Sequence, residues 1–118
     1  MTVVSRAVGR ADFDFQRFSD NEAAARWRRD NFDGRGYTPV DLRAWKGTFL
    51  MRLTDGRQVY AQACDLMTSQ GWAIAKIPYT AFSGQEWWAR RTGSWRIDVA
   101  GPNGEHRLIG WGYWTLSE

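Results

Sequence analysis

The alternation of apolar and polar side chains is clearest near the C-terminus. Trp95, Ile97 and Val99 alternate with charged residues, a period of two that is typical of a strand with one buried face. The dipeptide Asn103-Gly104 follows, and it is typical of a tight hairpin turn. The residues after the turn are rich in aromatic and β-branched types, so the pattern predicts an antiparallel hairpin.

Two glycines interrupt the second arm of this hairpin. Gly110 and Gly112 give room for a β-bulge or for a large neighbouring side chain. We therefore expect the rest of the chain to pack against a hairpin that accommodates bulky residues.

Four earlier segments alternate in the same way. We expect a first strand at residues 12–18, a hairpin at 45–64 that turns at Asp55-Gly56, and a strand at 72–77 that ends before Pro78. In the first arm of the hairpin, one face carries Trp45, Gly47, Phe49, Met51 and Leu53.

Two segments have the signature of short helices. Residues 19–29 begin with a capping box, Ser19 with Glu22, and continue through three alanines. Residues 81–93 contain a second capping box, Ser83 with Glu86, and end with Gly93 at the position of a helix C-terminus. We expect the second helix to cover one end of the core.

The length of 118 residues is sufficient for one domain. We predict a mainly β fold, an antiparallel immunoglobulin-like β-sandwich with one or two short helices, preceded by an N-terminal arm at residues 1–11. The single cysteine, Cys64, excludes an internal disulfide and a zinc site built on cysteines, and we interpret it as a structural thiol. The sequence lacks a signal-peptide pattern and a long apolar segment, so we expect synthesis in a host cytoplasm and no membrane.

The composition points to contact surfaces. The formal net charge is +3, and the basic residues are fourteen arginines and two lysines, beside eight tryptophans. Trp and Arg dominate the energetics of protein interfaces. Two local clusters supply the interface candidates, which are Arg26, Trp27, Arg28, Arg29, Trp87, Trp88, Arg90 and Arg91.

The same clusters also allow a nucleic-acid interpretation. Arginine can contact phosphates and tryptophan can stack on bases. The thirteen acidic residues are interleaved with the arginines, however, and a groove that follows a phosphate backbone is normally free of acid. The pattern therefore favours protein partners over nucleic acid.

We find no pattern for catalysis, a metal or a cofactor. His106 is the only histidine, and no nucleophile motif accompanies it. The alternation around Asp12 and Asp14 indicates a solvated strand face rather than metal ligands. Residues 30–36 lack the acidic spacing of a calcium loop and the lysine of a phosphate loop.

Several short motifs occur in order along residues 12–116. They are an early strand of alternating Asp and Phe, Pro39-Val40-Asp41-Leu42 before a strand with Arg52, an Asp-Gly turn, Gly71-x-Ala-x-Ala-x-Ile77-Pro78, a short helix, Gly93-x-Trp95-x-Ile97-x-Val99, Pro102-x-Gly104 and Leu108-x-Gly110. In this order they resemble the immunoglobulin-like β-sandwich of tailed-bacteriophage baseplate and tail-tip proteins. The chain is similar to the N-terminal domain of baseplate upper proteins and to small sandwich proteins of actinobacterial phage tails.

The resemblance implies a non-enzymatic virion structural protein that binds other tail or baseplate proteins in a symmetric assembly. The alanine-arginine helix departs from the family, in which we expect a simple turn. The family's sandwich often carries a further fibre or receptor-binding part, and we expect none here, which favours an adaptor or decorating subunit. A small phage inhibitor of a host complex remains an alternative, since such a protein also acts through protein contacts.

Overall fold

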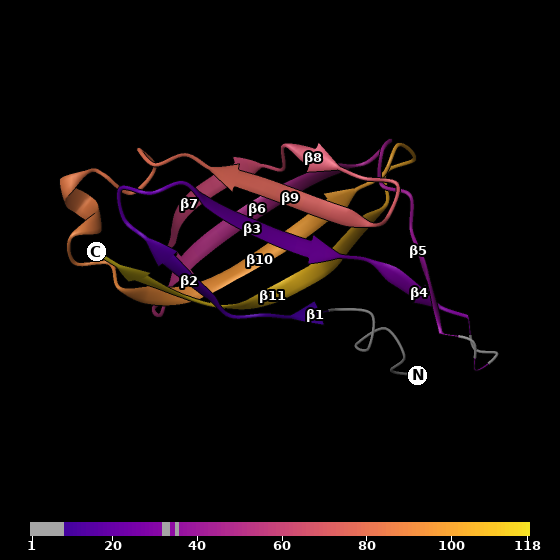
Figure 1. Cartoon of the computed structure of the whole chain (residues 1–118), viewed down its shortest axis with the longest axis horizontal. Coiled ribbons are helices and arrows are strands. Elements are labelled where there is room, and N and C mark those ends of the chain that lie inside the picture. Colours follow the sequence, from indigo (N-terminus) through magenta and orange to yellow (C-terminus); the bar gives the residue numbers. More distant parts are fainter. Residues whose placement is uncertain (1–8, 32–33, 35) are drawn as a thin grey trace.

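The computed structural model of the chain describes residues 9–31, 34 and 36–118. These residues form a β-sandwich-like fold of antiparallel and mixed sheets (Figure 1). Most of the predicted N-terminal arm, residues 1–8, lies outside the described residues. Its last part forms a short strand and a linker to the next strand.

The larger sheet is built around the C-terminal hairpin. Its path of strands in spatial order is β1 (Gly9–Arg10), β11 (His106–Ser117), β10 (Thr92–Ala100), β6 (Lys46–Leu53) and β7 (Gln58–Ala63). Strand β2 (Phe13–Gln16) also pairs with β11, and β1 and β2 both run parallel to it. The remaining pairs in this sheet are antiparallel.

The smaller sheet faces the larger one. It consists of β3 (Asn21–Arg26), β9 (Trp72–Ile77) and β8 (Leu66–Met67), paired in that order. A separate hairpin of β4 (Arg28–Asp30) and β5 (Tyr37–Pro39) extends beyond the sandwich at the right of Figure 1. The predicted loop 30–36 connects these two strands, although residues 32, 33 and 35 are outside the described part.

The predicted alternation is confirmed in the strands with large apolar side chains. On β10, Trp95, Ile97 and Val99 are buried, and on β6 Phe49 and Met51 are buried. The turns at Asp55-Gly56 and Asn103-Gly104 are also confirmed, and both glycines have positive φ angles of 88° and 85°. On β7 the aromatic ring of Tyr60 faces the core and contacts Phe49, Phe82 and Trp87.

The first predicted helix, at residues 19–29, is wrong, because this segment forms strand β3 instead. Phe18 has a positive φ of 63°, so the chain turns sharply before the strand. Ala23 and Ala25 point into the sandwich, and they pair with Ala75 and Ala73 of β9. Small side chains are needed here, since the Cβ of Ala25 packs closely on Gly110 in the facing sheet. Tertiary packing therefore overrides the helix propensity of alanine.

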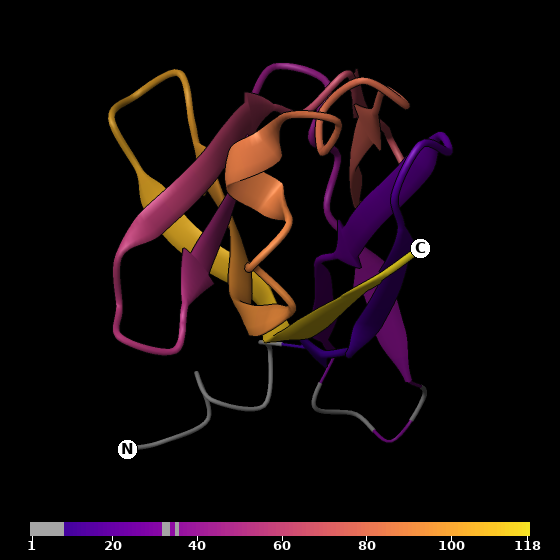
Figure 2. The same ribbon diagram turned by 90° about the vertical axis from the view of Figure 1, so that its left-hand side faces the viewer.

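The second predicted helix is also wrong in kind and length. Only residues Gln85–Trp87 form one turn of 3₁₀-helix, which starts after Gly84 without a side-chain cap. Gly93 does not end a helix but lies within β10, where a side chain would collide with the carbonyl oxygen of Arg52. The turn nevertheless covers one end of the core, between the two sheets (Figure 2), and places Trp87 inside.

Candidate protein-binding surfaces

The eight interface candidates lie at opposite ends of the molecule. Arg26, Trp27, Arg28 and Arg29 belong to β3, β4 and their junction, whereas Trp87, Trp88, Arg90 and Arg91 lie in or beside the 3₁₀ turn at the other end (Figure 1). The structure therefore divides the candidates into two separate surfaces.

The first surface, which we call the hairpin end, is built on Trp27. This side chain is 6% exposed and packs edge-to-face on Trp45, with 5.3 Å between the ring centroids. The guanidinium carbons of Arg29 and Arg107 lie 5.7 and 5.0 Å from the centroid of Trp27. Trp27 therefore belongs to the core and serves as a platform for two exposed or half-buried arginines.

Two further arginines of the hairpin end also lie over aromatic rings. Arg26 stacks on Trp72 at 5.4 Å, and its Nε donates a hydrogen bond to the carbonyl oxygen of Gln70 at 3.0 Å. Arg28 stacks on Tyr37 at 5.3 Å. Both rings are exposed, so each pair presents a charged edge beside an aromatic edge. Such contacts hold long side chains in a defined arrangement before any partner binds.

Sequence reasoning missed the partners of these arginines. Tyr37, Trp72 and Arg107 come from three separate segments of the chain. Local clustering could identify Arg26, Arg28 and Arg29, but the stacking depends on strand pairing between distant segments. The sequence therefore identifies one residue of each stacked pair but not the residue that it stacks on.

At the opposite end, the neighbouring residues Trp87 and Trp88 have contrasting environments. Trp87 is 3% exposed and packs on Phe82, with ring centroids 4.7 Å apart. Trp88 is 55% exposed. Only one of the two adjacent indoles therefore points into the core. The guanidinium carbon of Arg90 lies 4.8 Å from the ring centroid of Trp87, so Arg90 extends the surface around Trp88.

A buried arginine lies beneath Trp88. The guanidinium carbon of Arg17 is 5.4 Å from the centroid of Trp88, and Nη2 donates a hydrogen bond to the carbonyl oxygen of Trp87 at 2.8 Å. The Oε1 atom of Glu118 is 3.7 Å from Arg17 Nε and 3.9 Å from Arg91 Nη1. We call these residues the Arg17 site. The period of two places Arg17 on the same strand face as Phe13 and Phe15, which is the one sign of its burial in the sequence, although a charged residue is normally expected in solvent.

The outer face of the larger sheet carries a third group of aromatic and arginine residues. Trp111 and Tyr113 are exposed on β11, and Arg10 lies over both rings at 5.4 and 5.2 Å. Arg10 also pairs with Asp12 at 3.3 Å. The backbone N–H of Tyr113, followed by Arg10, lowers the pKa of Asp12 below its usual value. Alternation about Gly110 and Gly112 could have assigned these two aromatic rings to the outer face.

The strand register connects this group to the centre of the sheet. One row of neighbouring side chains crosses all five strands of the main path and consists of Arg10, Trp111, Arg96, Leu50 and Ala61. Arg96 is held by two hydrogen bonds to Asp98, of 2.6 and 2.7 Å, and these bonds raise the pKa of its guanidinium. The outer face of the larger sheet therefore combines apolar, aromatic and cationic side chains, and hydrogen bonds hold Arg96 in place.

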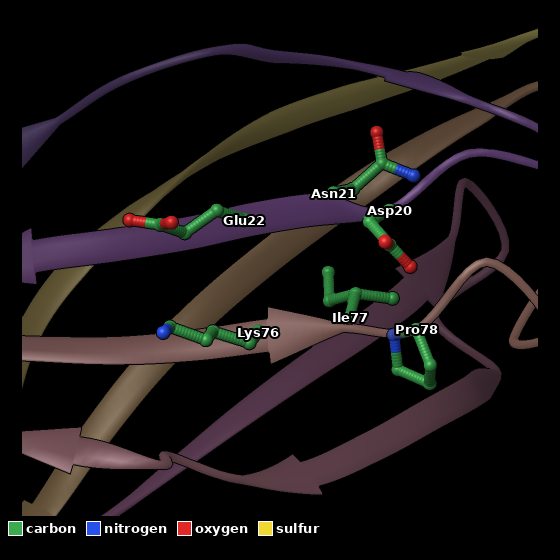
Figure 3. Close-up of a pocket in the computed structure, with 6 residues that line it drawn as sticks. All are labelled: Asp20, Asn21, Glu22, Lys76, Ile77 and Pro78. Atoms are coloured by element: carbon green, nitrogen blue, oxygen red, sulfur yellow. The ribbon is translucent and has the colours of Figure 1, made fainter.

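A depression lies at one end of the smaller sheet, and Figure 3 shows its lining residues. Glu22 and Lys76 are direct cross-strand neighbours there. Asp20 accepts a hydrogen bond from the backbone N–H of Tyr79 at 2.8 Å, so its carboxylate has a structural partner. The lining combines both signs of charge without a recognisable set of catalytic groups.

The described part of the chain contains no group of three or more His, Cys, Asp or Glu residues that could hold a metal ion. His106 is exposed at the first position of β11, and of the two exposed aspartates Asp12 lies just before β2 and Asp14 lies on it. Within the same described residues, no helix has the length and apolar character needed to cross a membrane.

Comparison of the chain with protein-family models gives no match, and comparison with curated proteins also gives none.

Proposed function

We propose that this protein is a non-enzymatic protein-binding module, and that it serves as an adaptor or decorating subunit of a bacteriophage tail tip or baseplate. In this role it needs no cofactor and binds neighbouring tail or baseplate proteins in a symmetric assembly within the virion. The physical part of the proposal is the binding module, and its place in a virion comes from the sequence resemblance.

The order of the strands supports an immunoglobulin-like assignment of the sandwich. The larger sheet contains the series β7-β6-β10-β11, and the smaller sheet contains β3-β9-β8. These series correspond to strands C′-C-F-G and B-E-D of variable-type immunoglobulin domains. In that correspondence, the β4–β5 hairpin belongs to the B–C connection, and the turn at residues 101–105 is the F–G connection. These two connections lie at the binding end of antibody variable domains, which is an analogy of fold only.

The observation that carries the proposal is the ordered arginine-aromatic surface of the hairpin end. Arg28 on Tyr37, Arg26 on Trp72 and Arg107 on Trp27 are three stacked pairs within one region. Arginine and aromatic side chains provide most of the strong contacts at protein interfaces. Because stacking already restricts these side chains, less conformational entropy is lost when a partner binds.

The same geometry favours a protein over a single-stranded nucleic acid. Binding of bases requires aromatic faces that are open for stacking. Here the rings of Trp72, Tyr37 and Trp27 already have guanidinium groups over them. The N–H edges of the arginines remain suited to the carboxylates and carbonyls of a protein.

A pull-down tests this proposal. The tagged full chain is incubated with a nuclease-treated lysate of cells that produce the particles, and bound proteins are identified by mass spectrometry. We expect tail or baseplate proteins with the wild type and at least a tenfold loss with Arg28→Ala or Tyr37→Ala. Arg57→Ala provides a matched control, because Arg57 is an exposed arginine in the β6–β7 turn.

Three results would overturn the proposal. Binding that disappears after nuclease treatment would indicate a nucleic-acid-binding module, and recovery of a host enzyme complex would indicate an inhibitor. Equal capture by wild type, Arg28→Ala and Tyr37→Ala would show that the hairpin end is not the binding surface.

A further inference from the structure

The guanidinium of Arg17 is buried with much of its hydrogen-bonding capacity unused. Its side chain is 0% exposed, and Nη2 donates to the carbonyl oxygen of Trp87. The Nε and Nη1 atoms have no hydrogen-bond partner in the described part of the chain. The backbone of Arg17 is fixed independently, since its N–H donates to Ser117 at 2.7 Å.

An arginine in this position needs an anion. Its guanidinium remains charged at any ordinary pH and has five N–H donors. Buried donors without acceptors are costly, and a charged donor is costlier than a neutral one. The nearby carboxylate of Glu118 compensates the charge but is 3.7 Å from Nε, which is too far for a hydrogen bond.

The carboxylate of Glu118 is shared between two arginines and held tightly by neither. The same Oε1 atom lies 3.9 Å from Nη1 of Arg91, and the Glu118 side chain is 57% exposed. The guanidinium groups of Arg17 and Arg91 therefore face the same carboxylate, and this carboxylate lies at the surface. The position of Glu118 shows that a carboxylate can approach Arg17 from this direction.

Trp88 forms the other side of the Arg17 site. Its indole lies over the guanidinium at 5.4 Å, and it remains largely exposed. A large exposed aromatic residue beside a buried cation is a common centre of a protein interface, where it excludes water from a charged pair. The site thus combines an anchoring ring with a charge that lacks an adequate acceptor.

We infer that the Arg17 site binds the carboxylate side chain of an Asp or Glu residue from a partner protein. The incoming carboxylate replaces that of Glu118, accepts the Nε–H of Arg17 and pairs with Arg91, while Trp88 packs against the partner. This inference rests on the proposed protein-binding function and identifies the chemistry of a second contact, at the end opposite the β4–β5 hairpin.

Sodium acetate is a suitable probe, because it presents a carboxylate alone. The arginine Nε–H signals of the full chain are followed by ¹⁵N NMR, for the wild type and for Glu118→Gln, which keeps the side-chain size but removes the charge. Acetate is compared with chloride at equal ionic strength. We expect a saturable shift of the Arg17 signal with acetate, at several-fold lower concentration in Glu118→Gln than in the wild type. The Arg57 signal serves as the exposed control.

A second variant tests the role of the ring. Trp88→Ala leaves the core in place, and it should weaken the acetate effect at Arg17 by at least threefold because water reaches the guanidinium. An Arg17 signal that is unaffected by acetate in Glu118→Gln, or that responds equally to chloride, would overturn the inference. A tighter response to inorganic phosphate than to acetate would also overturn it, in favour of a phosphate ligand.

This experiment is independent of the pull-down. A specific acetate response with a failed pull-down would leave the carboxylate site in place and remove the proposed partners. A successful pull-down without an acetate response would remove only the present inference.

Discussion

The indole of Trp95 lies directly against the backbone of Gly112. A Cβ atom at Gly112 would be 2.8 Å from Nε1 of Trp95 and would collide with the carbonyl oxygen of Ala11. That same carbonyl accepts a hydrogen bond from Nε1 at 2.8 Å. The absence of a side chain at Gly112 therefore lets the N-terminal segment, the last strand and the central tryptophan meet at one point.

Replacement of this tryptophan should be among the most damaging single changes. Trp95 is 3% exposed and stacks on Phe13 with ring centroids 4.5 Å apart. We expect Trp95→Ala to lower the free energy of unfolding by about 3–5 kcal/mol, because a large cavity opens in the core. Urea denaturation followed by circular dichroism measures the change. A decrease of less than about 1 kcal/mol would contradict a core position for Trp95.

The glycine partner can be tested separately. We expect Gly112→Ala to lower the free energy of unfolding by about 1–3 kcal/mol, since the new methyl group must displace the Ala11 carbonyl. Gly9→Ala is the matched control, because a Cβ at Gly9 meets no atom within 4 Å and its φ angle is not positive. Equal stability of the two variants, measured by urea denaturation, would contradict the close approach at Gly112.

The neighbours Trp87 and Trp88 allow a comparison within one turn of the chain. Trp87→Ala should destabilise the fold by about 3–5 kcal/mol, because it empties a core position. Trp88→Ala should cost no more than about 2 kcal/mol, because it removes a largely exposed ring from a cation–π contact with the buried Arg17. Thermal melts of both variants measure the difference. Partner capture should nevertheless fall for Trp88→Ala, and a loss of folding in both variants would remove the reason for an interface there.

The sequence predicts the sandwich well where alternating positions carry large apolar side chains. Strands β6 and β10 are read correctly because Phe49, Met51, Trp95 and Ile97 identify the buried face without ambiguity. The prediction fails at the alanine run of β3. Alanine favours helices when isolated, and only the facing sheet explains why small residues are needed at that place.

The strand assignment of the alanine run has a direct test. Ala24 is half-buried on β3 and pairs with Ile74 of β9. In a strand, Ala24→Val should be neutral or should stabilise by up to about 1 kcal/mol, because a β-branched side chain packs well across strands. In a helix the same change should destabilise by about 0.5 kcal/mol. Chemical denaturation of the variant distinguishes these signs.

The candidate surfaces show a similar division. The clusters at residues 26–29 and 87–91 are visible in the sequence as Arg and Trp next to one another. Their stacking partners Trp72 and Tyr37, and the buried Arg17, come from segments that only the fold brings near. The sequence therefore indicates which residue types form the surfaces. It does not show which distant residues join each cluster, because that depends on the pairing of strands far apart in the chain.

The thiol of Cys64 should give the fold a sensitivity to alkaline pH. Burial, followed by the nearby charge of Asp65, raises the pKa of Cys64 from 9.0 to about 11. Because the folded state holds the neutral thiol, its stabilising effect is fully present below pH 9 and is lost as the pH rises through about 11. The wild type should therefore lose stability relative to Cys64→Ala across this window, as urea midpoints at pH 8 and above would show. Tyr60, whose pKa is also raised by burial, affects both proteins alike. Parallel pH profiles for the two proteins would contradict the raised pKa of this partly buried thiol. Rapid alkylation of Cys64 by iodoacetamide at pH 8 would contradict it as well, since a thiol with a raised pKa holds little thiolate there.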